Sequence, residues 1–315
     1  MPRFKTDSER MKHKQAKLIP ASMWYDNQLF YENLDETVLA IMKVDKSENL
    51  IPVLTNSYPK LNDQWKKKQA WLGIALAHPN NFALLMQAAK ILQFSNNSLF
   101  SLFVILGNLA FISEFTKELP YAEVLDLIKE NEFYAYRKGA EHGHLGTLEF
   151  METKAPDLTQ EMIIANNYAA YKHAAQNGHV DIMKKLERSA PDLVTEMIQA
   201  QTYYPFRLAA HNGRLEVVKH LIAKANLFLD DMMQADNFFA YRKSTEKGHL
   251  DVSNELIANS SICFDYAEAN SQKNQQNTAN VSKMGVFNHK PEEVDHTQDG
   301  PNSNLAASHS STVDK

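Results

Sequence analysis

The sequence predicts an all-α protein built as a helical repeat solenoid. The first observation is a set of glycines spaced 35 residues apart: Gly143, Gly178, Gly213 and Gly248. The second is that the columns around each glycine also repeat, with a basic residue six positions before it and a leucine or valine two positions after it. A unit of this size buries its apolar face only by stacking on its neighbours, as in a helical solenoid.

Each unit is predicted to contain two helices that meet at the glycine. Before Gly213, apolar residues recur with helical spacing, and after it Leu215, Val218 and Leu221 line one face of a second helix. The residue that follows a helix C-terminus often needs a positive φ angle, which glycine adopts without a Cβ clash. We therefore expect Gly213 to have a positive φ.

A short third helix is expected to open each unit. Ala-Pro-Asp-Leu begins at Ala155 and Ala190, and an acidic residue and apolar residues follow. Proline and acidic residues are both favoured in the first turn of a helix. Gly107 and Pro120 stand in the repeat register, so residues 96–130 are expected to form a divergent, buried repeat.

The run from Pro205 to Leu221 resembles the helix-turn-helix half of the ankyrin repeat, whose pattern is TPLHxAAxxGHLEVVxxL. The short helix takes the place of that family's projecting hairpin. The 35-residue form, with Ala-Pro-Asp-Leu and Met-Ile-x-Ala, is similar to ankyrin proteins that intracellular bacteria secrete into host cells. Glu292-Glu293-Val-Asp295 resembles the C-terminal signal of some type IV effectors. The resemblance implies a protein-protein interaction scaffold, acting as a bacterial effector on a host protein.

Residues 31–72 resemble an F-box, the three-helix module that docks on the Skp1 subunit of a ubiquitin ligase. The apolar positions that carry this resemblance are Leu34, Val38, Leu39, Met42, Leu50 and Trp71. The resemblance implies Skp1 binding through these residues, with the repeats holding a ubiquitylation target. The alternative is an ordinary helical cap on the solenoid. Pro52 is expected in the first turn of its helix.

Four regions follow from these patterns. We expect a mobile basic arm at 1–20, an α-helical N-terminal domain at 21–95, ankyrin-like repeats at 96–264 and a disordered tail at 265–315. The tail is poor in apolar residues and cannot form a core. A third function alternative places an enzyme in the N-terminal domain, although no catalytic constellation is visible and the chain is not expected to be an enzyme.

Composition restricts the remaining function classes. A net charge of −5 gives no case for nucleic-acid binding. One cysteine excludes an internal disulfide and fits a reducing, cytoplasmic location, including the host cytosol for a secreted effector. The apolar run at 99–112 is short for a membrane span. We expect a monomer without cofactor or metal.

Two repeating columns are predicted to serve the stack. His144, His179 and His249 occur once per repeat, too far apart to share a metal ion, and are expected to hydrogen-bond neighbouring turns. The basic ladder of Arg137, Lys172, Arg207 and Arg242 is expected to be held by carbonyls of the adjacent repeat, the alternative being an acidic ligand.

Columns that vary between repeats are the better candidates for partner binding, because they are not constrained by stacking. They include an aromatic column, interrupted by Ala169, and the pairs of residues at the end of each first helix. The candidate partner-binding residues are Tyr134, Glu141, His142, Gln176, Asn177, Tyr204, His211, Asn212, Phe239, Glu246 and Lys247.

Overall fold

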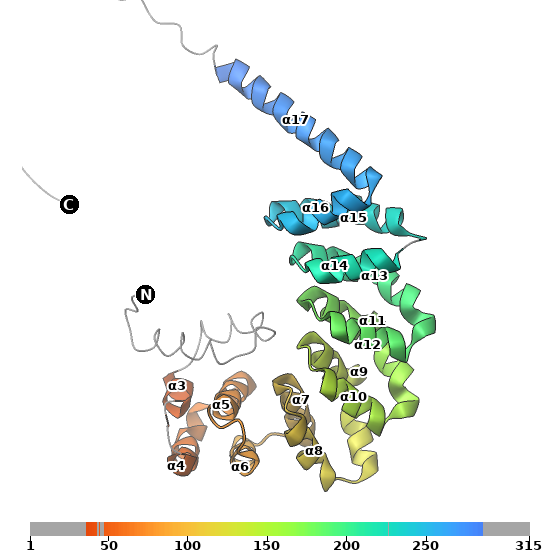
Figure 1. The fold of residues 1–315 in the computed structure, drawn as a ribbon. Helices are drawn as coiled ribbons and strands as arrows, with labels where there is room; N and C mark the ends of the chain where they lie inside the picture. The colour runs from red at the N-terminus through yellow and green to blue at the C-terminus, as the bar shows by residue number, and fades with distance from the viewer. Residues whose placement is uncertain (1–35, 43, 45–46, 226, 286–315) are drawn as a thin grey trace, which may run out of the picture. The chain divides into compact units, whose positions relative to one another are not determined.

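The computed structural model describes residues 36–42, 44, 47–225 and 227–285. Within these residues the secondary structure is helical, with no strand (Figure 1). The N-terminal helices are α3 (Glu36–Met42), α4 (Ser47–Ser57), the 3-10 turn η2 (Tyr58–Lys60), α5 (Gln64–Ala77) and α6 (Phe82–Leu92). The repeats comprise α7 (Asn96–Leu106), α8 (Leu109–Lys117), α9 (Tyr121–Glu141), α10 (Leu145–Lys154), α11 (Thr159–Asn177), α12 (Val180–Ser189), α13 (Val194–His211), α14 (Leu215–Lys224), α15 (Leu229–Glu246) and α16 (Leu250–Asn259), followed by α17 (Ser261–Gly285).

The helix pairs from α7–α8 to α15–α16 stack in chain order, which confirms the predicted all-α solenoid (Figure 1). The turn glycines have positive φ, as expected for Gly213 at +67° and in the divergent repeat for Gly107 at +67°. A second constraint acts on Gly213. A Cβ built there would lie 2.6 Å from Nδ1 of His249 in the next repeat, so the site excludes a side chain as well as requiring a positive φ.

The short opening helix of each unit is also confirmed, in place of a hairpin. In one unit, the 3-10 turn η3 (Pro156–Leu158) leads into α11 at Thr159. A left-handed turn that the sequence did not predict then interrupts each long helix. In α9, the residues Asn131, Glu132 and Phe133 have φ values of 48°, 54° and 58°. The same turn recurs at 166–168, 201–203 and 236–238.

A left-handed conformation costs a residue with a Cβ about 1–2 kcal/mol, so three in succession need support. The basic ladder supplies it. In α9, Arg137 donates from Nη2 to the Asn131 carbonyl at 2.8 Å and from Nε to the Glu132 carbonyl at 3.0 Å. Arg207 and Arg242 make the same pair of bonds. The expectation that these cations are held by carbonyls of the adjacent repeat is wrong, because the turn in the same repeat supplies them.

Other bonds join each repeat to the next. Nε2 of His144 lies 2.9 Å from the Ile105 carbonyl, and Nε2 of His179 lies 3.1 Å from the Glu141 carbonyl. Arg214 occupies the same column and donates from Nε to the Gln176 carbonyl at 3.2 Å. These contacts confirm the predicted bonds of His144 and His179 to the backbone of a neighbouring turn, whereas the bond expected of His249 stays a prediction.

Polar bonds also join the two helices of a pair within two of the repeats. Tyr136 donates to Glu152 at 2.8 Å, and Tyr171 donates to Glu187 at 2.9 Å. In the next repeat the corresponding positions hold Phe206 and Ile222, so hydroxyl and carboxylate are lost together. A lone buried carboxylate would be costly, which accounts for the paired replacement.

Glu187 also binds a cation from the following repeat. Its Oε1 lies 2.7 Å from Nε2 of His220, and its Oε2 lies 3.3 Å from Nζ of Lys224. Burial alone would raise the pKa of the Glu187 carboxyl. His220, Tyr171 and Lys224 outweigh that effect and hold its pKa below the usual value, so the carboxylate is charged at neutral pH.

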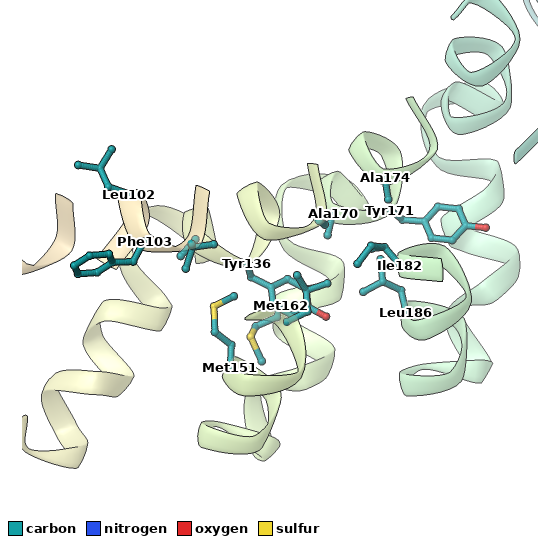
Figure 2. Packing of buried hydrophobic residues seen from close by; sticks show 14 of the residues in the cluster. Leu102, Phe103, Tyr136, Met151, Met162, Ala170, Tyr171, Ala174, Ile182 and Leu186 are labelled. Atoms are coloured by element: carbon teal, nitrogen blue, oxygen red, sulfur yellow. The ribbon is translucent and has the colours of Figure 1, made fainter. Parts of the chain in front are cut away.

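Apolar side chains fill the space between the helix pairs as one continuous core (Figure 2). In Figure 2, Tyr136, Met151 and Met162 meet between neighbouring repeats, and Ile182 and Leu186 of α12 point towards α11. The large side chains are wholly buried, including Phe103 and Tyr171 at 0% exposure. The divergent repeat belongs to this core through Phe103 and Ile112, whereas Ile105 is half-buried.

The N-terminal helices join the solenoid through Trp71 of α5. Its side chain is 0% exposed, and its Nε1 donates to the Leu85 carbonyl of α6 at 3.1 Å. Its ring lies 5.4 Å from Phe103 of α7 and 6.5 Å from Phe94. Phe82 of α6 also contacts Phe103, at 5.9 Å between ring centroids. The core therefore runs without a break across residues 95–96.

One local prediction in this region is wrong. Pro52 lies in the middle of α4, not in its first turn. The proline has no N–H for the carbonyl of Glu48, four residues earlier. Both residues are exposed, so water can replace that bond.

The C-terminal end also differs from the prediction. Residues 265–285, expected to be disordered, belong to the helix α17. A shortage of apolar residues prevents a core but not a helix, and this stretch has good helix formers and no proline.

The described residues divide into two compact units after Tyr266. The tail at 286–315 and the basic arm at 1–20 lie outside the described residues, and the division at 95/96 stays a prediction.

Cys263 lies in the first turn of α17 and is 1% exposed. Burial raises the pKa of its thiol to about 11. Because the thiolate is the nucleophile, iodoacetamide at pH 7.5 should not label the folded protein within the time that labels the urea-unfolded chain. Mass spectrometry measures the extent of labelling. Equal labelling of both states would contradict the burial of this side chain.

Candidate interaction surface

The second halves of α9, α11, α13 and α15 lie side by side in the stack (Figure 1). In each of them, the residues three, four and seven positions after the aromatic column share one face of the helix. We call this surface the long-helix face. Its columns are Tyr134, Ala169, Tyr204 and Phe239, then Arg137, Lys172, Arg207 and Arg242, then Lys138, His173, Leu208 and Lys243, and finally Glu141, Gln176, His211 and Glu246.

Aromatic rings and cations alternate on the long-helix face. Lys172 and Arg207 lie 5.9 Å and 5.8 Å from the ring of Tyr204, and Arg207 lies 5.4 Å from that of Phe239. At the other end, Arg137 and Lys138 each lie 5.8 Å from the ring of Tyr134. These distances suit cation–π attraction. The three rings are partly exposed, as a binding column requires, but Ala169 is buried.

The predicted residues at the helix ends divide into two groups. Asn177 donates to the Glu141 carbonyl at 3.0 Å, and Asn212 donates to the Gln176 carbonyl at 3.1 Å. These two amides therefore join successive repeats and have a structural role. They have the same role as the histidine column. Their spacing of 35 residues, which equals the repeat length, was the sequence signal that could have predicted this structural role.

The remaining helix-end residues lie on or beside the face. Glu141 pairs with Lys138 at 2.8 Å, and Glu246 pairs with Lys243 at 2.5 Å. Lys247 is exposed, Gln176 is half-buried, and the ring of the buried His142 stacks on that of His144 at 6.1 Å. Basic side chains outnumber acidic ones on this face, although the whole chain is acidic.

His211 occupies the most unusual position on the face. Its ring lies 6.2 Å from that of Phe239, and its buried Nδ1 has no hydrogen-bond partner among the described residues. Burial, together with the charges of Lys247, Lys243 and His249, lowers the pKa of His211. The imidazole is therefore neutral at pH 7, and its Nδ1 is covered by the surrounding residues.

The residues of the F-box resemblance are placed differently. Val38, Leu50 and Trp71 are buried, at 0%, 1% and 0% exposure, inside the N-terminal helices. Leu39 and Met42 belong to α3, and Leu34 lies outside the described residues. The burial of the three described side chains favours the cap interpretation.

In the described part of the chain, no three His, Cys, Asp or Glu side chains gather in a way that could hold a metal ion. Among these helices, none combines the length and the apolar character needed to cross a membrane.

No protein-family model and no curated protein sequence matches the chain. Among solved structures, the X-ray structure of an ankyrin repeat family protein from Legionella pneumophila is similar, with a TM-score of 0.56. The match covers 82% of this chain and 98% of that one, at 19% sequence identity. At this identity the likeness concerns the fold alone. The chain therefore has an all-α, ankyrin-like repeat fold.

Proposed function

We propose that the chain is a protein-interaction scaffold that binds its partner through the long-helix face. The observation that carries this proposal is the row of partly exposed aromatic rings, Tyr134, Tyr204 and Phe239, each flanked by cations. Tyrosine and arginine are over-represented among residues that dominate binding energies.

We further propose that the partner is a host protein and that the chain acts as a bacterial effector. The support is the 35-residue repeat form with Ala-Pro-Asp-Leu and Met-Ile-x-Ala. The similar Legionella pneumophila structure is also described as an ankyrin repeat family protein. The adaptor alternative, with Skp1 and a ubiquitylation target as partners, stays a prediction that the burial of Val38 and Leu50 does not support. Nothing in the described helices favours an enzyme at 21–95, so we do not propose one.

The test begins with affinity purification from eukaryotic cytosol, followed by titration of the purified partner. Tyr204→Ala combined with Phe239→Ala should weaken that partner's affinity by about 30-fold or more, since truncating a hot-spot residue costs ~2 kcal/mol or more. The matched control is Tyr121→Ala on α9, because this tyrosine is 61% exposed and lies outside the face.

An unchanged affinity in the double variant, with the fold intact by circular dichroism, would place the binding surface elsewhere. Capture of Skp1 by the parent protein, lost on Leu34→Ala with Leu39→Ala at unchanged thermal stability, would instead favour the adaptor.

A further inference from the structure

A hollow of about 670 Å³ opens between the short helices α12 and α14 and the start of α13, all within one compact unit. We call it the basic hollow. None of its lining residues belongs to the long-helix face. Its charged and titratable lining residues are Lys184, Glu187, Arg188, His220 and Lys224. The volume is in the range of sites that hold a small ligand or one side chain of a partner.

Positive charge exceeds negative charge in the basic hollow. Glu187 is the one carboxylate among the described lining residues, and both of its oxygens are already bonded. Oε1 accepts from Tyr171 and lies 2.7 Å from Nε2 of His220, and Oε2 lies 3.3 Å from Nζ of Lys224. Three cations, those of Lys184, Arg188 and Lys224, thus face one carboxylate. Two positive charges remain without a counter-charge in the lining.

The two cations left over are Lys184 and Arg188. They lie four residues apart, on one face of α12, and both are exposed. Neither side chain forms a hydrogen bond or an ion pair with another described residue. Asp192, the next carboxylate along the chain, is exposed but does not line the hollow. Both cations are therefore available to a group from outside the chain.

The repeat architecture does not account for either cation. Six positions after the turn glycine, the four units carry Glu149, Lys184, Lys219 and Asn254. Ten positions after it, they carry Thr153, Arg188, Ala223 and Ala258. The basic ladder, in contrast, recurs in every unit because a turn depends on it. Lys184 and Arg188 occupy columns that stacking leaves free to vary.

We propose that the basic hollow binds a phosphorylated side chain in a segment of a partner protein. A phosphate monoester carries a charge of about −1.5 to −2 at pH 7, which matches the two uncompensated cations. The planar guanidinium of Arg188 can donate to two phosphate oxygens at once, and Lys184 adds a mobile point charge. Pro191 and Val194 give the hollow an apolar side, against which a residue next to the phosphate can pack.

Exposed carboxylates on the same elements favour a discrete phosphate over a membrane surface. Asp181 lies on α12, Asp192 lies just before α13, and Glu216 lies on α14. Anionic lipids act on basic segments over a broad surface, and these carboxylates would be repelled by it. A single phosphate group needs only the hollow. The proposal rests on the scaffold function in one respect, that the phosphate belongs to a protein.

The probe is the synthetic peptide acetyl-Gly-Leu-phosphoserine-Val-Gly-amide, titrated into the full-length protein by calorimetry. It should bind saturably, whereas the same peptide with serine should show no binding. A peptide with aspartate in place of phosphoserine should bind more weakly than the phosphopeptide, because a carboxylate carries one charge and two oxygens.

Variants test the two cations directly. Lys184→Ala combined with Arg188→Ala should weaken the phosphopeptide by about tenfold or more, since bonds to charged groups are the strong ones. Both residues are exposed, so circular dichroism should show an intact fold. Arg188→Lys keeps the charge but loses the fork, and should bind less tightly than the parent. The matched control is Lys219→Ala, an exposed lysine of α14 outside the lining, which should change affinity by less than about twofold.

Three results would each overturn the proposal: no saturable binding up to ~1 mM phosphopeptide; equal affinity in the Lys184→Ala, Arg188→Ala variant; or equal affinity for the serine peptide. A fourth concerns the source of the phosphate. Co-sedimentation of the protein with phosphatidylcholine vesicles that contain phosphatidylinositol 4-phosphate, unaffected by excess phosphopeptide, would contradict a protein ligand.

The basic hollow and the long-helix face can fail separately. Tyr204→Ala with Phe239→Ala should bind the phosphopeptide as the parent does, because neither ring lines the hollow. Loss of the purified partner in that variant, with phosphopeptide binding unchanged, would support both sites. Loss of phosphopeptide binding in that variant would count against a separate site in the hollow.

Discussion

Trp71→Ala is expected to lower the free energy of unfolding by about 3–5 kcal/mol. The ring is wholly buried and contacts Phe94 and Phe103, so its removal leaves a cavity between α5, α6 and α7. The buried carbonyl of Leu85 also loses its indole donor. Urea unfolding followed by far-ultraviolet circular dichroism measures the change, because this signal does not depend on tryptophan emission.

Trp65→Ala is the matched control on the same helix. Its side chain is 49% exposed, and we expect a change within about 1 kcal/mol. A Trp71→Ala protein as stable as Trp65→Ala would mean that the N-terminal helices do not pack on the solenoid. That outcome would restore the idea of an independent module at 31–72.

Gly213→Ala is expected to destabilise the protein by about 2–5 kcal/mol. A left-handed φ costs alanine about 1–2 kcal/mol, and crowding in a packed site costs about 1–3 kcal/mol more. The crowding arises because the new Cβ would meet the imidazole of His249 at 2.6 Å. Relief requires the ring to move out of the turn, which loosens the junction between two repeats.

Gly248→Ala separates the two contributions. This glycine has a φ of +78°, similar to the +67° of Gly213, but a Cβ there would have no described atom within 4 Å. Its replacement should therefore cost only the backbone part, about 1–2 kcal/mol. Thermal and urea unfolding of both variants give the difference. Equal destabilisation would show that the histidine ring yields without cost.

The repeat architecture could be predicted because identical columns impose the same local structure each time. The positive φ of Gly213 and the hydrogen bonds of His144 and His179 could be predicted because each of these residue types recurs at a fixed position in the unit. Each repeat thus supported the same local prediction again. The buried divergent repeat followed from the register of Gly107 and Pro120 alone.

Features that depend on contacts between distant residues could not be predicted in the same way. Nothing in the sequence near Trp65 and Trp71 says that one is half-exposed and the other buried, because the partners of Trp71 lie on α6 and α7. For the left-handed turns there was a signal. A polar pair such as Asn166-Asn167 or Asp236-Asn237 precedes an aromatic residue in each unit, and Asn and Asp tolerate this conformation best.

The basic ladder has a consequence for how such a chain can change in length. Arg207 and Arg242 stabilise turns five and six residues earlier in their own units, so a unit carries the cation that its own turn needs. The bonds between units also keep a constant separation, 36 residues for Asn177 and Asn212 and 38 for His179 and Arg214. Duplication or deletion of 35 residues therefore restores the left-handed turns and the bonds of these two columns, and the length of the long-helix face can be altered without redesigning the units that form it.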